Sequence, residues 1–255
     1  MNEQPIIENI TCSCGTAFQW EKFETELGEK FNSMFRPKLC DPCQDQVNAE
    51  NQLKRNHQEA QERAEIVRRT KDSLGDRTPA RYRATDTAHP AFNVKLWQRI
   101  QKWRPTPEAP WLGLVDESGA SKTRCAFLLL HDIVVESVNS SKKGRARSFE
   151  VATSYELAEA IRNQYGKGDD SAKARAFIDG MRRVSILLLD DLGKAKNTEA
   201  VSAELFAILD RRHAENLATI WTANSSPNEI VTGMSADLAG PLAGRLIECS
   251  QIVTA

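Results

Sequence analysis

Long hydrophobic runs are missing from this sequence of 255 residues. No apolar stretch reaches the length of about 18 residues that a membrane-spanning helix requires, which argues against a membrane protein. The first residues also lack the basic and apolar regions of a secretory signal peptide. We therefore expect no membrane partner and a cytoplasmic location.

An excess of charge of either sign is missing as well. The chain has 34 Lys and Arg residues against 35 Asp and Glu residues, so its formal net charge is −1. This balance excludes a polycation, and any contact with nucleic acid must come from local patches. Hydrophobic residues make up 40% of the chain, which is enough to form a core and to exclude general disorder.

Cysteines are few, and they are unevenly placed. Two of the six, Cys125 and Cys249, stand alone in apolar surroundings and are expected to be small buried hydrophobes. The other four form two pairs separated by 25 residues: Cys12, Cys14, Cys40 and Cys43. In a reducing compartment such pairs favour a metal site over disulfides.

The segment that carries the four cysteines is too short to build a core unaided. A tetrahedral Cys₄ zinc would supply the missing stability, so we predict a zinc-binding module over residues 1–46. The C-x₂-C pair has the usual spacing, whereas the C-x-C pair is tighter, and four unconnected thiols remain the alternative. Aromatic residues lie between the pairs: Phe18, Trp20, Phe23, Phe31 and Phe35.

Residues 44–75 are rich in Gln, Glu, Ala, Arg and Lys and contain no Pro. They predict one long solvated helix, with a charged linker helix over 47–76. From Lys54 to Arg83 there are nine basic and five acidic residues. This excess fits an exposed spacer better than a nucleic-acid arm. Prolines then break the pattern on either side of a short amphipathic helix at 93–103.

From Trp111 onward, short apolar runs alternate with helical segments of ten residues or more. This alternation predicts an α/β fold with a mostly parallel sheet covered on both faces, within a domain over 77–255. The predicted strands are WLGLV, FEVAT, VSILLLD, LATIWTAN and CSQIV.

The loop after the first of these strands resembles a phosphate-binding P-loop. That motif, G-x-x-x-x-G-K-[ST], cradles phosphates with backbone N–H groups, and its hydroxyl ligates Mg²⁺. The chain keeps Gly119, Lys122 and Thr123, but it has Asp116 and Ser121 at the two defining glycines. A serine costs about 1 kcal/mol where the backbone needs a positive φ, and an Asp facing the phosphates would repel them. Taken alone, an ordinary helix start explains this loop equally well.

Two more strand ends change that balance. The run VSILLL is followed by Asp190 and Asp191, about 60 residues after the loop. Such a pair can deliver one carboxylate to Mg²⁺ and another to the attacking water. The strand LATIWTAN ends at Asn224, whose amide can reach a γ-phosphate, although the turn NSSPN also explains an Asn here. Because ligands of parallel sheets bind at the carboxyl ends of strands, we predict a nucleotide site there.

These residues resemble the AAA+ ATPases of the DnaC-type helicase-loader and IstB-type transposition-helper group, including phage replication versions. The similarity runs from about Pro79 to the C-terminus. It rests on ARYRATD, KTR, ILLLDDLG and ELFAILDRRHAENLATIWTAN. The resemblance implies an AAA+-like P-loop NTPase fold, preceded here by a Cys₄ zinc module and a long helix.

Carried over by position, the resemblance implies a Walker A motif that includes Lys122 and Thr123, a Walker B pair at Asp190 and Asp191, and a sensor at Asn224. It also implies that Arg245 is an arginine finger for a neighbouring subunit, although a solvent-exposed Arg at a helix end is the plainer reading. Arg211 and Arg212 match a basic pair for which we assign no role beyond the subunit interface. Only ten residues follow Arg245, so we expect this sequence to lack the C-terminal helical lid of larger AAA+ proteins.

The resemblance predicts an ATP-dependent helicase loader that uses ATP, Mg²⁺ and Zn²⁺. Its expected partners are a replicative helicase, single-stranded DNA and copies of itself, with ATP at subunit interfaces. The basic loop at 139–148 either follows DNA phosphates or is simply solvated. Two alternatives stay open: an IstB-like transposition helper, and a non-hydrolysing zinc-containing adapter whose P-loop is degenerate.

Overall fold

The computed structural model describes residues 6–22, 38–141 and 144–254 of the chain. It divides into two compact units, Met1–Glu62 and Arg63–Ala255, which we describe separately. Some residues named above lie outside the described ranges: Phe23, Phe31, Phe35 and positions 142 and 143 of the basic loop. Among the described residues, no helix is long and apolar enough to cross a membrane.

The N-terminal unit begins with a β-hairpin that the sequence analysis did not predict. Strand β1 (Ile6–Thr11) pairs antiparallel with β2 (Ala17–Lys22), in a register that sets Ile10 opposite Phe18. The turn between them closes through a hydrogen bond from the Gly15 N–H to the carbonyl of Cys12, and Gly15 has a φ of 89°. That value suits glycine, which has no Cβ to clash.

The long helix of the sequence analysis is present as α2 (Asp41–Arg77). Its first turn contains an acidic residue and a proline, both favourable at a helix start, and Pro79 follows its end. Side-chain hydrogen bonds four residues apart support its exposed face, for example from Gln58 to Glu62 at 2.9 Å. The helix spans the division between the two units.

The C-terminal unit contains a parallel sheet of five strands in the order β4-β5-β6-β3-β7. All five predicted strands are present, shifted by at most two residues. Their bounds are β3 (Trp111–Val115), β4 (Phe149–Thr153), β5 (Ile186–Leu192), β6 (Ala218–Ala223) and β7 (Ser250–Thr254). Nearly every residue of β5 and β6 is buried, as expected for strands covered on both faces.

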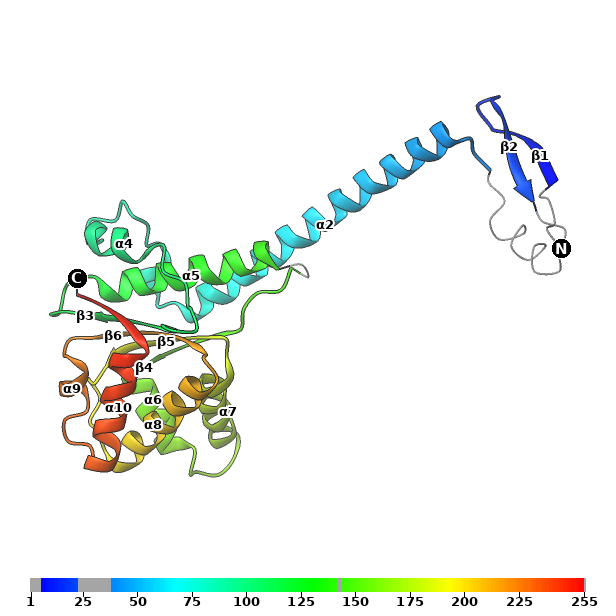
Figure 1. The fold of residues 1–255 in the computed structure, drawn as a ribbon. Coiled ribbons are helices and arrows are strands. Elements are labelled where there is room, and N and C mark those ends of the chain that lie inside the picture. Colours follow the sequence, from blue (N-terminus) through cyan, green and yellow to red (C-terminus); the bar gives the residue numbers. More distant parts are fainter. Residues whose placement is uncertain (1–5, 23–37, 142–143, 255) are drawn as a thin grey trace. The chain divides into compact units, whose positions relative to one another are not determined.

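Helices cover both faces of this sheet (Figure 1). One face packs against α4 (Val94–Ile100) and α5 (Lys122–Ser140), and the end of α2 and the short α3 (Ala80–Arg83) join the same core cluster. The other face packs against α6 (Ser154–Asn163), α7 (Asp169–Arg183), α8 (Glu199–Ala214) and α10 (Ala236–Glu248). The four-residue α9 (Pro227–Ile230) precedes α10. Alternate residues of β5 point to opposite clusters, so the sheet separates two cores.

The interior strand β3 packs closely against a side chain of its neighbour β6. Gly113 is paired with Trp221, and a Cβ built on Gly113 would stand 2.3 Å from a ring carbon of that tryptophan. Trp221 is fully buried, and its indole N–H donates to the Ser250 hydroxyl at 2.9 Å. The glycine therefore lets a large indole ring fill the space beside the strand that leads into the P-loop-like segment.

Candidate functional site

The predicted site residues meet where the strands end. Because β3, β5 and β6 are parallel neighbours, their carboxyl ends reach the same edge of the sheet. A cavity of about 260 Å³ opens there. Its walls include six of the predicted residues, namely Gly119, Ser121, Lys122, Thr123, Asp191 and Asn224. The structure thus brings together residues that are about 100 positions apart in the sequence.

The loop before α5 contains two residues with positive φ. Gly119 has a φ of 94° and Ser121 a φ of 63°. The serine therefore does occupy a left-handed position, where glycine is more favourable by about 1 kcal/mol. Its hydroxyl donates to the carbonyl of Ala91, and this contact holds the strained residue against the segment before β3.

The Lys122 ammonium group folds back over this loop. It donates to the carbonyls of Asp116 at 2.7 Å and Glu117 at 2.8 Å, and Lys122 is only 5% exposed. Burial lowers the pKa of Lys122, and the charge of Asp116 opposes that shift. The Asp116 carboxylate accepts from the Glu117 N–H at 2.7 Å. Among the described residues, the hydrogen-bond partners of this buried cation are neutral carbonyls, which leaves the ammonium group suited to receive an anion.

A buried carboxylate lies beside the start of α5. The Oδ1 atom of Asp190 accepts hydrogen bonds from the hydroxyls of Thr123 at 2.8 Å and Thr222 at 2.7 Å. Asp190 is 6% exposed, and burial raises its pKa while the two hydroxyls lower it. The hydroxyl of Thr123 and the carboxylate of Asp190 are hard oxygen donors of the kind that Mg²⁺ prefers. The chemistry of this pair fits a Mg²⁺-bound phosphate.

Asp191 sits in a strained backbone position at the cavity wall. Its φ is 58°. The backbone N–H of Asp191 donates to the Thr222 hydroxyl at 2.9 Å, and its carbonyl accepts from the Ser154 hydroxyl at 2.8 Å. Its carboxylate forms an ion pair with Lys194 at 2.7 Å. The strain turns the Asp191 side chain toward the cavity, whereas Asp190 points to Thr123.

Sequence reasoning missed several residues of this site. Lys194, Arg81 and Tyr82 also line the cavity. The Thr222 hydroxyl donates to the Asp190 carboxylate and accepts from the backbone N–H of Asp191. Thr222 was detectable as a polar residue within an otherwise apolar strand. Arg81 and Tyr82 belong to the ARYRATD segment, which the resemblance placed before the nucleotide site without giving it a role. Lys194 carried no signal of its own.

The structure does not bring Arg245 to this cavity. Arg245 lies on α10, forms an ion pair with Asp210, and stacks its guanidinium over the Phe206 ring at 4.6 Å from the centroid. In the described part of the chain it is not among the residues that line the cavity. Its role as an arginine finger stays a prediction, which concerns a second copy of the chain.

Arg212 requires a correction, because it is fully buried instead of lying at a subunit surface. Its guanidinium donates to the carbonyls of Met181 at 2.8 Å and Val184 at 2.9 Å, and to the Thr219 hydroxyl at 2.9 Å. It also donates to the carbonyl of Ala218. Arg212 is therefore a structural residue that joins α7, α8 and β6. Arg211 is exposed and pairs with Glu215.

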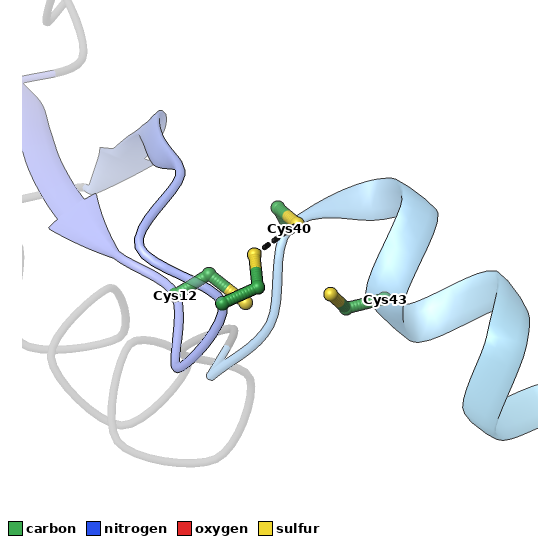
Figure 2. A group of neighbouring side chains, drawn as sticks. Cys12, Cys40 and Cys43 are labelled. Atoms are coloured by element: carbon green, nitrogen blue, oxygen red, sulfur yellow. Dashed lines mark hydrogen bonds between the residues drawn. The ribbon is translucent and has the colours of Figure 1, made fainter.

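The four N-terminal cysteines form a cluster in the other unit. Their Sγ atoms all lie within 4.8 Å of one another, and those of Cys14 and Cys40 are 3.6 Å apart. Figure 2 shows Cys12 on the hairpin side facing Cys40 and Cys43 at the start of α2. Zn–S bonds of about 2.3 Å in a tetrahedron set sulfur atoms about 3.8 Å apart. The cluster is therefore compatible with one zinc ion.

The thiols influence one another strongly. Backbone N–H groups of Cys14 and Cys40 lower the pKa of Cys12 to about 6, which favours a thiolate. Hydrogen bonds with Cys14, Cys40 and Cys12 raise the pKa of Cys43 to about 12. A dication among four sulfur atoms removes this conflict, because it stabilises every thiolate at once.

Comparison with known proteins gave matches among solved structures alone. No protein-family model matches the sequence, and no curated protein matches it significantly. The crystal structure of DnaI matches with a TM-score of 0.51 and 16% sequence identity, over 71% of this chain and 95% of DnaI. At this level of identity, the likeness to DnaI concerns the fold alone.

Two further solved structures match with lower TM-scores. The DnaC helicase loader matches with a TM-score of 0.46 and 22% identity, over 69% of this chain and 99% of that one. AMPPCP-bound DnaA from Aquifex aeolicus matches with a TM-score of 0.46 and 18% identity, over 63% of this chain. The match covers 44% of that DnaA chain. The predicted mostly parallel α/β fold is confirmed by the five-stranded sheet, and this fold is similar to that of DnaI.

Proposed function

We propose that this chain is an ATP-dependent DNA replication helicase loader. The observation that carries the proposal is the meeting of Lys122 and the Thr123–Asp190 pair at one cavity edge. A cation for phosphates and oxygen ligands for Mg²⁺ are the two parts that a P-loop NTPase needs. When bound, Mg-ATP would supply the phosphoanhydride whose hydrolysis drives a conformational change.

In this proposal the residues around the cavity have separate tasks. Gly119, Ser121 and Lys122 hold the phosphates, and Thr123 and Asp190 hold Mg²⁺. Asp191 and Asn224 orient the attacking water at the exposed end of the cavity. Arg245 acts on the ATP of a neighbouring subunit in a homo-oligomer.

The proposed partners are a replicative helicase and single-stranded DNA. The fold shared with DnaI supports a loader. The N-terminal cysteine cluster argues against a transposition helper of the resembled group, because such helpers usually begin with a helical domain. The cysteine module and α2 would contact the helicase or the DNA, with zinc as the bound metal. The exposed Arg145 and Arg147 are the described basic residues of the loop at 139–148. They are candidates for phosphate contacts.

Thermal unfolding with and without Mg-ATP tests the nucleotide site. Saturation at a hundred times the dissociation constant stabilises a protein by about 2.7 kcal/mol, so the wild type should unfold several degrees higher. Lys122→Ala should lose this shift because it removes the cation, whereas the exposed Lys102→Ala should keep it. No shift in wild type at millimolar Mg-ATP would favour the non-hydrolysing adapter.

A second assay tests the loader role itself. The expected result is ATP turnover that changes on adding single-stranded DNA, together with ATP-dependent binding to a replicative helicase. Turnover combined with binding to a transposase, and none to a helicase, would instead establish the transposition helper.

A further inference from the structure

A second cavity, also of about 260 Å³, lies within the C-terminal unit beside the end of α2, α3 and the middle of α5. Three basic side chains reach it from these different elements: Lys71, Arg83 and His131. Among the described residues that line this cavity there is no Asp or Glu. Basic groups from three elements thus converge on one space that contains no opposite charge.

The His131 ring has an unusual environment for a half-buried imidazole. No hydrogen bond to it is found in the described part of the chain. Burial and the nearby charge of Lys71 lower the pKa of His131, and the adjacent Asp132 opposes this shift. No carboxylate of the described lining balances the charges of Lys71 and Arg83, and a bound anion would stabilise both cations.

Acidic residues of the same helices, among them Asp72 and the Asp132 that follows His131, lie outside this lining. Asp72 lies 3.7 Å from Arg68 on the same helix. Arg83 donates through Nε to the carbonyl of Thr78 at 2.9 Å. This bond orients the guanidinium beside the cavity and leaves its other N–H groups available to a ligand.

Apolar and aromatic side chains also line the cavity. The rings of Tyr82 and Phe127 stack with centroids 5.5 Å apart, and Leu128 lies beside them. The hydroxyl-bearing Thr78 and Thr85 complete the lining. A lining that combines basic groups with aromatic and apolar side chains suits a ligand with one anionic group and a small organic body.

The hydrogen-bond donors of the lining indicate which kind of anion the cavity would bind. Lys, Arg and His donors match a phosphate dianion, which offers three acceptor oxygens. Mg²⁺ is not expected to accompany it, because the lining lacks the carboxylates that this ion prefers. Apart from Tyr82, no described residue lines both cavities. The second cavity therefore differs in composition and in metal requirement from the candidate nucleotide site.

We propose that this cavity is a second anion site, which binds a phosphate monoester without a metal ion. The site does not depend on the proposed helicase-loader function. The monoester has two possible sources, a free small phosphate or the 5′-phosphate end of a DNA strand, and both present the same group to Lys71, Arg83 and His131.

The imidazole resonances of His131 provide a local readout in the full-length protein. The chain has four histidines, and His131→Gln identifies the signal. Ribose 5-phosphate should shift this signal and raise the pKa of His131, because a dianion stabilises the imidazolium form. The double variant Lys71→Gln, Arg83→Gln should weaken binding at least tenfold, whereas the exposed Lys102→Gln should not change it.

The Lys122→Ala variant separates this site from the nucleotide cavity. If the proposal is correct, ribose 5-phosphate still shifts the His131 signal in that variant. Loss of the shift there would place the phosphate in the first cavity and overturn the proposal. Absence of any shift at about 10 mM ligand, or an unchanged affinity in the double variant, would overturn it as well.

Oligonucleotides distinguish the two sources. A 5′-phosphorylated strand that displaces ribose 5-phosphate, when its unphosphorylated counterpart does not, would support the monoester site and assign it to DNA ends. Ribose 5-phosphate binding without displacement by either strand would support it for a free small phosphate. Equal displacement by both strands would contradict a monoester site, since it would show recognition of phosphodiesters.

Discussion

Asp190 shows how a single buried carboxylate shapes the site. The folded protein raises its pKa, mainly through burial, so folding favours the protonated form. The resulting contribution to stability is therefore greatest below the unfolded pKa and is lost as the pH rises through the folded one. At neutral pH the ionised carboxylate costs stability, and a bound cation would offset that cost.

We expect Asp190→Asn to raise the stability of the nucleotide-free protein at neutral pH while abolishing the effect of Mg-ATP. The amide oxygen can still accept from Thr123 and Thr222, but no buried charge remains. A gain of about 1 kcal/mol would raise the melting temperature by about 2–4 °C. Thermal unfolding at pH 7, with and without Mg-ATP, measures both effects.

The exposed Glu108→Gln serves as the matched control and should change neither quantity. A variant at position 190 that still gained stability from Mg-ATP would remove this carboxylate from the metal site. Repeating the scans at lower pH should narrow the gap between wild type and Asp190→Asn, because protonation then neutralises the native carboxylate too.

On the scale of elements, Arg212 joins two helices to the sheet. Its guanidinium donates to carbonyls at the end of α7 and on β6, and Met181 and Ala218 are buried. Buried polar groups that lose their partners cost about 1–3 kcal/mol each. This one side chain therefore contributes to the packing of a whole face of the unit.

Arg212→Ala should lower the free energy of unfolding by about 3–5 kcal/mol, because it leaves several carbonyls unpaired and opens a cavity. The neighbouring Arg211→Ala removes an exposed ion pair and should cost at most about 1 kcal/mol. Denaturant unfolding compares the two. Equal losses in both variants would contradict the structural role of Arg212.

The strands of this fold were predictable because burial on both faces produces nearly continuous apolar runs in the sequence. ILLLDD of β5 and ATIWTA of β6 have no solvent-facing residue that would force alternation. The polar residues that end β5 and β6 also predicted which edge carries the site. That reasoning needed only the parallel direction of the strands, not their order.

Other features left no comparable mark. The hairpin of β1 and β2 has only weak alternation of apolar residues, and its stability depends on a turn beside the cysteines. The pair Arg211 and Arg212 is chemically uniform, so its split into one exposed and one buried residue arises from packing. Lys194 meets Asp191 only because the chain turns sharply after β5.

On the scale of the molecule, a zinc ion held by the cysteine cluster would give the N-terminal unit a source of stability other than a core. We expect about one zinc per chain, and we expect its loss when Cys40 and Cys43 are changed to Ser. Structural zinc contributes about 10–16 kcal/mol of apparent binding free energy in small domains, so the N-terminal unit should unfold when the metal is removed. Metal analysis and circular dichroism measure the two effects.

The remaining two cysteines provide a matched control. Cys125 and Cys249 are buried in the other unit, so changing them to Ser should leave the zinc content unchanged. A metal-free N-terminal unit that stayed folded would show that four thiols sufficed without an ion.

The proposed role of Arg245 concerns an assembly of several copies of the chain. Arg245→Ala should keep ATP binding but reduce turnover, since an arginine finger is typically worth about 10³–10⁵ in rate. Mixing it with Lys122→Ala subunits should restore part of the activity at hybrid interfaces. Those interfaces combine an intact Lys122 from one subunit with an intact Arg245 from the next.

Recovery in the mixture is decisive, because a residue that acts within its own subunit can also lower turnover when changed. If no mixing ratio recovers activity, although both variants are folded and co-assemble, Arg245 does not act across the interface. Its ion pair with Asp210 and its contact with Phe206 would then describe its whole role.

The close contact between Gly113 and Trp221 also limits which substitutions this sequence can accept during evolution. No side chain at position 113 fits beside the indole, so any enlargement there is excluded while Trp221 is present. A smaller residue at position 221 alone would open a void beside the interior strand β3. The two positions are therefore epistatic, and related sequences should replace them together or not at all.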